Sequence, residues 1–231
     1  MNGHTNIFVQ ARMGSSRLPG KALKRLKGKT IIEWVATRLL NVDRIHNLVY
    51  LIPDTSENDI LCDVIQRLSH RNNIVRGCEH DVFSRFVEGI RCYPCNQFIR
   101  VCADNPLICW AELNRLVDEF LGHHCRYAFN HIPRGTNYAD GFGAEIVDTA
   151  SFLSLEQLNL TQTEREHVFN GLHRVLEERE IRTFDSNLSF NASNLRFDCD
   201  TQSDLNFLET LNMDPSQSMS EILRRNFCEI N

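Results

Sequence analysis

Short apolar runs alternate with longer amphipathic segments through the first half of this chain. The apolar runs predict strands over residues 6–11, 48–52 and 97–102, with a further strand beginning at Ile74. Apolar positions at helical spacing predict helices over residues 30–41, 59–68, 81–92 and 111–121. Thr30 is the expected N-cap of the first of these helices, because its hydroxyl can accept a bond from a free backbone N–H.

Strands that alternate with helices of this length form βαβ units, which build a mostly parallel sheet covered by helices on both faces. An α/β fold of this kind binds its ligands outside the carboxyl ends of its strands. Two loops rich in charged and polar residues follow Ala11 and Ala103, each at the end of a predicted strand. The pattern therefore predicts that both loops lie on the ligand-binding edge.

The alternation of predicted strands and helices ends after Phe129. Residues 130–145 contain Pro133 and three glycines, which predicts an irregular loop or lid. Beyond it the pattern predicts a polar helix over 162–180, a short strand over 195–200 and a helix over 203–211. We expect a single domain over residues 1–231, in which residues 130–195 form the lid region.

Composition narrows the functional class. The chain has 231 residues and a formal net charge of −5, which argues against a general binder of nucleic acid. No segment has the roughly 20 apolar residues of a membrane span, and the first residues do not resemble a signal peptide.

Nine cysteines lie mostly in apolar runs, as reduced thiols in the cytoplasm would. Cys92 and Cys95 form a CxxC pair, but a lone pair is a weak zinc or redox signal.

The segment 12–21, RMGSSRLPGK, has the residues of a triphosphate-binding loop. Glycines let the backbone approach a ligand, and serines offer hydroxyl and amide donors. Three cations, Arg12, Arg17 and Lys21, can neutralise the charge that grows on a pyrophosphate leaving group. The spacing differs from a Walker A loop, and the alternative is a solvated basic turn. The residues expected to bind the nucleotide are Ala11, Arg12, Gly14, Ser15, Ser16, Arg17, Lys21 and Asp104.

Acidic residues in two further segments are candidate metal ligands. Asp104 follows a predicted strand in the segment ADNPL, where it can hold Mg²⁺ or serve as a turn or cap residue. Asp198 and Asp200 alternate in RFDCDT, so on a strand both carboxylates point to one face. The alternative for Asp200 is that it caps the following helix.

A third set of polar residues has weaker signals for acceptor binding. Its members lie in the glycine-rich loop, in the segment EREH, and in the segment 77–85; they are Asp140, Glu145, Glu166, His167 and Arg85. His167 can equally be a structural histidine, and residues 77–81 can simply begin a capped helix.

Taken together, these motifs resemble the cytidylyltransferase family that includes the acylneuraminate and 3-deoxy-manno-octulosonate enzymes, and most of all its spore coat polysaccharide branch. The matching segments are VQARMGSSRLPGKAL, GCEHDVFSRF, RVCADNPLI, DGFGAEIVDTASF, EREHV and LRFDCDTQSDL. The resemblance implies a Rossmann-like nucleotide-diphospho-sugar transferase fold, often as a homodimer, and transfer of CMP from CTP to a sugar or sugar acid. It also implies that Asp104 and Asp200 hold Mg²⁺. With this resemblance, we expect residues 1–231 to form one nucleotidyltransferase domain, whose lid region, residues 130–195, binds the acceptor and contributes to dimerisation.

The mechanism that we expect has the acceptor hydroxyl attack the α-phosphorus of CTP while pyrophosphate leaves. Lys21 and Arg12 would stabilise the developing charge, and Asp104 and Asp200 would hold the metal. Asp198 is a candidate third ligand or base. Arg85, Arg134 and Arg165 are candidates to bind an acceptor carboxylate.

Some residues depart from the branch, and rival functions stay open. Cys102 stands where Thr is usual, Asn105 where Cys is usual, Gln202 where Pro is usual, and Asp198 where an uncharged residue is common. The rivals are a nucleotidyltransferase that uses GTP or UTP, a glycosyltransferase whose DxD motif is Asp198-Cys-Asp200, and a non-catalytic nucleotide-binding module.

Overall fold

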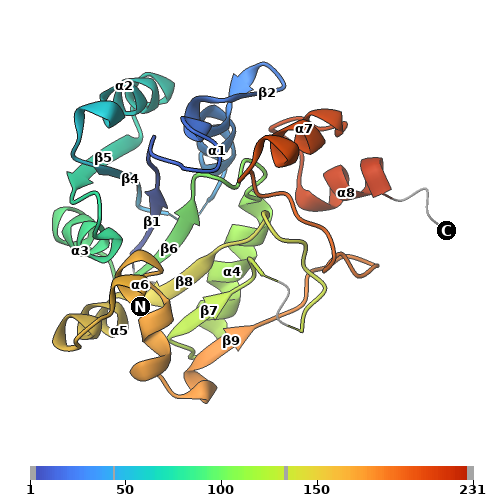
Figure 1. Ribbon diagram of the computed structural model, residues 1–231. Coiled ribbons are helices and arrows are strands. Elements are labelled where there is room, and N and C mark those ends of the chain that lie inside the picture. The colour runs from blue at the N-terminus through green and yellow to red at the C-terminus, as the bar shows by residue number, and fades with distance from the viewer. Residues whose placement is uncertain (1–3, 44, 133–134, 228–231) are drawn as a thin grey trace.

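A central seven-stranded sheet organises the protein (Figure 1). The computed structural model describes residues 4–43, 45–132 and 135–227. The strands follow the order β5-β4-β1-β6-β8-β7-β9. Their bounds are β1 (Thr5–Gln10), β4 (Asn47–Pro53), β5 (Asn72–Gly77), β6 (Gln97–Cys102), β7 (Tyr127–Phe129), β8 (Glu145–Asp148) and β9 (Ile181–Thr183).

The first four strands of the sheet run parallel, as the alternating pattern predicts. β1 pairs in parallel with β4 on one side and with β6 on the other, and β4 pairs in parallel with β5. β8 then runs antiparallel to β6, β7 antiparallel to β8, and β9 parallel to β7. A small hairpin of β2 (Arg25–Leu26) and β3 (Lys29–Thr30) lies outside this sheet. The expected mostly parallel α/β fold is confirmed.

Helices cover both faces of the sheet. One face packs against α1 (Ile31–Leu39), α2 (Asp59–Leu68) and α4 (Trp110–Gly122), and the other against α3 (Val82–Cys92) and α5 (Thr149–Ser154). Helices can pack on both faces because the strands are apolar on both. In β1, Ile7 and Val9 point into the apolar cluster on the first face, and Phe8 points into the cluster on the second. No helix among the described residues is long and apolar enough to cross a membrane.

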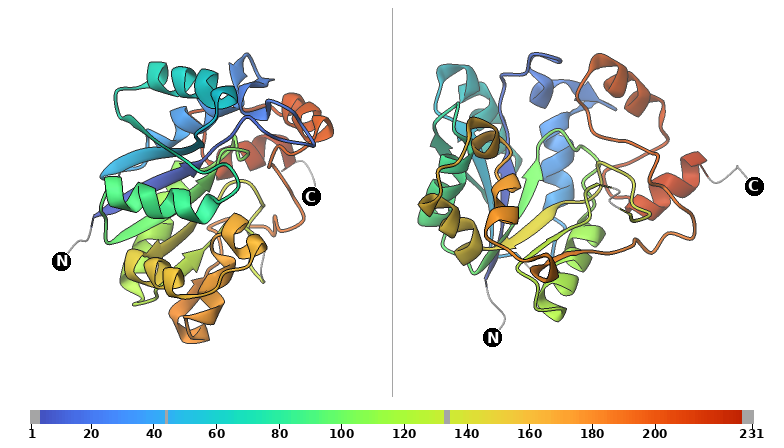
Figure 2. Two further views of the ribbon diagram at one scale, coloured as in Figure 1. Left: turned by 60° about the vertical axis from the view of Figure 1, so that its left-hand side comes forward. Right: turned by 60° about the horizontal axis from the view of Figure 1, so that its bottom comes forward.

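A third apolar cluster packs the C-terminal helices against α1 and the loop after β1. α7 (Gln202–Thr210) and α8 (Met219–Phe227) lie beside α1, away from α3 (Figures 1 and 2). Their side chains share a buried cluster with Trp34 of α1 and Leu18 of the loop after β1. The C-terminal helices therefore help to hold that loop.

The boundaries of most predicted elements are close to the observed ones. Thr30 is the N-cap of α1, where its side chain and that of Glu33 form a capping box. The predicted helix over 59–68 matches α2, and the predicted strand over 97–102 matches β6. These segments carry strong local signals, namely caps and complete apolar periods.

Two predicted elements are wrong. The helix expected over 162–180 ends after α6 (Gln162–Glu166), and 3₁₀ turns follow at Asn170–Arg174 and Glu178–Glu180. The chain leaves the helix at His167 because Val168 and Phe169 are buried in the core beneath α3 and α5.

The strand expected over 195–200 is an extended segment with a single bridge between Asp140 and Arg196. Within the described ranges, no strand of the sheet pairs with it. Its backbone bonds go to loops instead: Phe197 N–H donates to Asp140 O (3.0 Å) and Cys199 N–H to Asp104 O (2.8 Å).

Gly143, which packs against the backbone of Asn130, provides a test of the observed packing. A Cβ at this position would lie 2.0 Å from the carbonyl oxygen of Asn130, which is backbone and cannot rotate away. We expect Gly143→Ala to lower the free energy of unfolding by about 3 kcal/mol, at the upper end of the range for overpacked positions. Gly122→Ala is the control, because a Cβ there, at the end of α4, would have no heavy atom within 4 Å. Urea denaturation of both variants measures the difference, and equal stabilities would contradict the observed packing.

Candidate functional site

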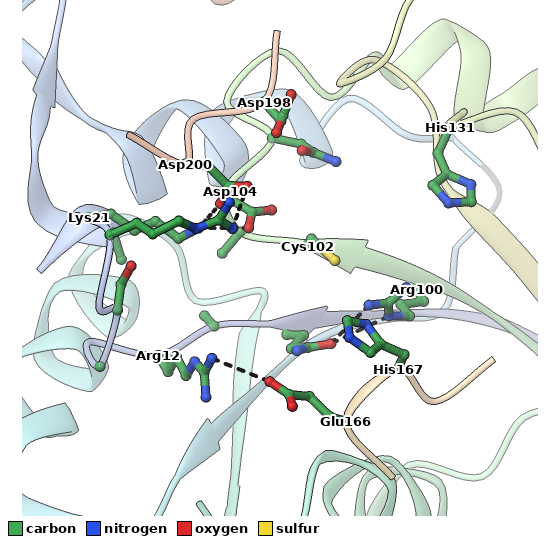
Figure 3. Close-up of a pocket in the computed structure, with 18 of the residues that line it drawn as sticks. Arg12, Lys21, Arg100, Cys102, Asp104, His131, Glu166, His167, Asp198 and Asp200 are labelled. Carbon is green, nitrogen blue, oxygen red and sulfur yellow. Dashed lines mark hydrogen bonds and ion pairs between the residues drawn. The ribbon is translucent and has the colours of Figure 1, made fainter. Parts of the chain in front are cut away.

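A pocket of about 660 Å³ lies at the carboxyl ends of β1 and β6 (Figure 3). The pocket is formed by the loop that follows β1, by the end of β6 and the turn after it, and by three later segments. Its lining residues include thirteen of those predicted from the sequence: Ala11, Arg12, Gly14, Ser15, Ser16, Arg17, Lys21, Asp104, Asp140, Glu166, His167, Asp198 and Asp200.

The loop after β1 is held by two contacts and a tight turn at Gly20. The backbone N–H of Met13 donates to the side-chain oxygen of buried Asn58 (2.8 Å), and Leu18 is buried in the third apolar cluster. Gly20 has a φ of 66°, a left-handed conformation that glycine adopts without strain. These constraints fix the loop before any ligand is bound. The alternative of a solvated basic turn is therefore disfavoured.

The centre of the pocket is an ion-pair cluster of residues that are far apart in the sequence. The Lys21 ammonium donates to Asp104 Oδ2 (2.8 Å) and to Asp200 Oδ1 (2.9 Å). Arg17 Nη2 donates to the other oxygen, Asp200 Oδ2, at 2.7 Å. Burial lowers the pKa of Lys21, but the two carboxylates outweigh burial and raise it above its ordinary value. Lys21 therefore stays positively charged in this pocket.

The structure decides between the alternatives for the two central aspartates. The N-cap of α7 is Thr201, whose hydroxyl accepts the Asp204 N–H, so Asp200 does not cap that helix. The N-cap of α4 is Cys109, so Asp104 does not cap a helix either. Neither aspartate is therefore a helix cap, although Asp104 does lie in the turn that follows β6, and both carboxylates line the pocket.

Asp198 and Asp140 both line the pocket beside this cluster. Asp198 is bound by Arg196, with Arg196 Nε 2.9 Å from Asp198 Oδ1 and a second bond from Nη2. Burial, with the charge of Asp198, raises the pKa of Asp140 to about 6. Within the described part of the chain, no group of three or more His, Cys, Asp or Glu side chains is close enough for a metal ion. Asp198 therefore stands apart from the Asp104–Asp200 pair.

The Asp104–Asp200 pair nevertheless fits a magnesium ion. Two carboxylate oxygens from different segments approach one cation, the Lys21 ammonium, from 2.8 and 2.9 Å. Mg²⁺ in proteins is commonly held by one or two carboxylates, with phosphate oxygens and water completing its shell. The donor set and its convergence match that requirement.

The opposite end of the pocket is built around Arg100, which was not predicted from the sequence. Its side chain is 14% exposed and contacts Gln10 Oε1 from Nε and Nη2, each at 3.4 Å. Nη1 donates to Glu145, whose other oxygen accepts from Tyr127 at 2.6 Å. Arg100, Cys102 and Asp104 alternate at the end of β6 and line the same pocket. A charged residue inside an apolar run was the signal available in the sequence.

Two predicted acceptor residues do not line the pocket. Glu145 is 5% exposed and holds Arg100 from behind. Arg85 is 1% exposed, and its Nη1 donates to Leu51 O at 3.3 Å inside the core. These predictions are wrong because both side chains point into packed protein, which sequence spacing could not reveal.

Of the other candidate acceptor residues, His167 lines the pocket, whereas segment 77–81 and Arg165 do not. Asp81 is the N-cap of α3 and binds Arg165, so the segment 77–81 is a capped helix start. Arg165 does not line the pocket, and Arg134 lies outside the described residues. His167 is exposed and lines the pocket beside Glu166, which is 3.8 Å from Arg12. A purely structural, core-filling role for His167 is therefore disfavoured.

The CxxC pair does not form a shared site. Cys92 contacts Glu88 and Cys95 contacts Thr149, at 3.6 and 3.5 Å. All eight cysteines in the described segments are free thiols.

Comparison with known proteins gives a consistent result over nearly the whole chain. The spore coat polysaccharide biosynthesis protein SpsF of Bacillus subtilis is 25% identical over 233 aligned residues, which cover 94% of this chain and 91% of that protein. A 3-deoxy-manno-octulosonate cytidylyltransferase of Trichlorobacter lovleyi is 29% identical over 117 residues, which cover 50% of this chain and 44% of that protein.

Solved structures show the same fold. A cytidylyltransferase from Leptospira borgpetersenii superposes with a TM-score of 0.84 at 24% identity, covering 95% of this chain and 92% of that one. The synthetase of CMP-2-keto-3-deoxy-manno-octonic acid, solved with CTP, gives a TM-score of 0.66 at 17% identity, covering 90% of this chain and 97% of that one. The sequence profile of the cytidylyltransferases matches residues 7–226. The chain therefore belongs to the cytidylyltransferase family.

Proposed function

We propose that this protein transfers CMP from CTP to a sugar acid and releases pyrophosphate, with Mg²⁺ as its cofactor, in the synthesis of a surface polysaccharide. One observation carries the proposal: in a member of the cytidylyltransferase family, Lys21, Asp104 and Asp200 meet at the carboxyl ends of β1 and β6. The names of the relatives support a sugar acid as acceptor and a polysaccharide as the destination.

Each end of the pocket has a separate task. The loop after β1 supplies backbone donors and the cations Arg12, Arg17 and Lys21 for the triphosphate. The acceptor would bind toward Arg100 and His167, which line the pocket away from this loop, and its hydroxyl would attack the α-phosphorus. A new oxygen–phosphorus bond forms as the bond to pyrophosphate breaks, and positioning with charge neutralisation provides most of the catalysis.

Asp104 and Asp200 would hold Mg²⁺ at their point of convergence. When bound, the metal would neutralise phosphate charge and lower the pKa of the attacking hydroxyl. Lys21 and Arg12 stabilise the charge that develops on the leaving pyrophosphate.

The rival functions have weaker support. A glycosyltransferase DxD motif requires Asp198 and Asp200 to act together on one metal, but Asp198 is bound by Arg196 and Asp200 by Lys21 and Arg17. A non-catalytic module has no need for the buried cation Lys21 between two carboxylates. The family favours cytosine over guanine or uracil.

A cytoplasmic location and a homodimer remain part of the proposal. The free thiols in the described part of the chain support a reducing compartment. Sedimentation of the full chain measures its oligomeric state.

Replacement of Lys21 tests the triphosphate end. We expect Lys21→Ala to reduce turnover by about 10²–10³, the range for loss of one donor that stabilises developing charge. Pyrophosphate release from CTP, with a panel of sugar acids as acceptors and with GTP and UTP as competing nucleotides, measures the loss and the base preference. Lys24→Ala is the control, because Lys24 is exposed and does not line the pocket. Near-normal release by Lys21→Ala would refute the role of the loop.

Replacement of Arg100 tests the acceptor end. We expect Arg100→Met to raise the KM for the acceptor by roughly 10- to 100-fold, because a charge-assisted hydrogen bond is lost, and to leave the KM for CTP nearly unchanged. Arg67→Met in α2 is the matched control, since Arg67 is exposed and lies outside the pocket. The double variant Arg100→Met/Glu145→Gln removes both charges of the buried pair and guards against simple unfolding. An unchanged KM for the acceptor in the folded variants would refute this assignment.

A further inference from the structure

Every carboxylate in the pocket that was predicted to bind metal is already neutralised by a cation of the protein itself. Lys21 bridges Asp104 and Asp200, Arg17 binds the second oxygen of Asp200, and Arg196 binds Asp198. Three carboxylates thus face three side-chain cations. Each of these three carboxylates therefore has a cationic partner within the protein, without any divalent ion.

The Lys21 ammonium lies where a metal shared by Asp104 and Asp200 would have to bind. Its nitrogen is 2.8 Å from Asp104 Oδ2 and 2.9 Å from Asp200 Oδ1 (Figure 3). Two like charges a few ångströms apart repel strongly in a partly buried site, where Lys21 is 16% exposed. A divalent ion therefore cannot occupy this point while Lys21 keeps both bonds.

Lys21 has a route away from the carboxylates. Its side chain is a flexible stem with a compact charge, and it arises from the end of the loop whose serines and cations also line the pocket. A triphosphate in that pocket offers the ammonium new anionic partners. Arg17, whose side chain is 64% exposed, can move to the same phosphates and release the second oxygen of Asp200.

We propose that Lys21 is a place-holding cation that keeps divalent ions from Asp104 and Asp200 until a nucleotide binds, so that metal and nucleotide bind together. The inference rests on the proposed function for the identity of the nucleotide, but the exclusion of metal by Lys21 does not. Its consequence is positive coupling: phosphate draws Lys21 and Arg17 away, and the freed carboxylates then accept the ion.

Mn²⁺ binding to the full chain without nucleotide tests the exclusion. Free Mn²⁺, measured by electron paramagnetic resonance, should reveal at least about tenfold tighter binding to Lys21→Met than to the unmodified protein, because the repelling charge is gone. Lys24→Met, which removes an exposed cation three residues away, should bind as the unmodified protein does. The double variant Lys21→Met/Asp200→Asn should lose the gain, since one of the two carboxylates is neutral.

If Lys21→Met is too unstable for binding measurements, the effect of Mn²⁺ on its Tm provides a second test. Without its cation, the variant holds two facing carboxylates, so its Tm should be lower and should rise with Mn²⁺ more than that of the unmodified protein. Lys21→Gln, which removes the charge but keeps hydrogen-bond donors, should behave in the same way. Equal Mn²⁺ affinities for Lys21→Met, Lys21→Gln and the unmodified protein would overturn the inference.

Calorimetry with CTP separates this inference from the proposed function. If the unmodified protein fails to bind CTP in the presence of Mn²⁺, the proposed function is wrong, whereas tighter Mn²⁺ binding by the charge-removing variants still supports exclusion. If CTP binds and is turned over but those variants bind Mn²⁺ no more tightly, the inference alone is overturned.

Discussion

β1 and β6 lie side by side in parallel, with Gln10 opposite Cys102, so both strands end at the same edge of the sheet. That register brings the loop after β1 against the turn after β6, and the bond from Ala103 N–H to Gln10 O (3.0 Å) continues the contact past the strands. Lys21 can then reach Asp104, 83 positions later in the chain. Without this pairing, the cations and carboxylates would have no common pocket.

The rest of the pocket follows from the need to pair charge in a partly buried space. A buried ion without a partner is strongly unfavourable, so cations and carboxylates from distant segments settle against one another. Lys21 binds Asp104 and Asp200 at one end, and Arg100 binds Glu145 at the other. These pairs join segments of the pocket that are far apart in the chain. An anionic nucleotide and a divalent ion must replace some of these ion pairs when they bind.

The C-terminal segment completes the site through packing rather than through the sheet. Cys199 N–H donates to Asp104 O, and Asp200 follows directly. The segment is held on its other side by the cluster in which Phe197 packs against Phe142, and α7 and α8 cover it. A carboxylate from near the end of the chain therefore depends on an apolar cluster that includes Leu18 of the nucleotide loop.

The sequence by itself predicted the parallel core, the loop that ends at Lys21, and Asp104 and Asp200 as carboxylates of the same site, whereas their ion pairs with Lys21 appeared only in the structure. These conclusions follow from local signals: alternation, helical spacing, caps and glycine-rich turns act over a few residues. The tertiary structure alone decided the break after Glu166, the burial of Arg85, and the contact between Arg100 and Glu145. Each of these depends on which distant segments pack together, because burial and ion pairing between remote positions leave no periodic trace in the chain.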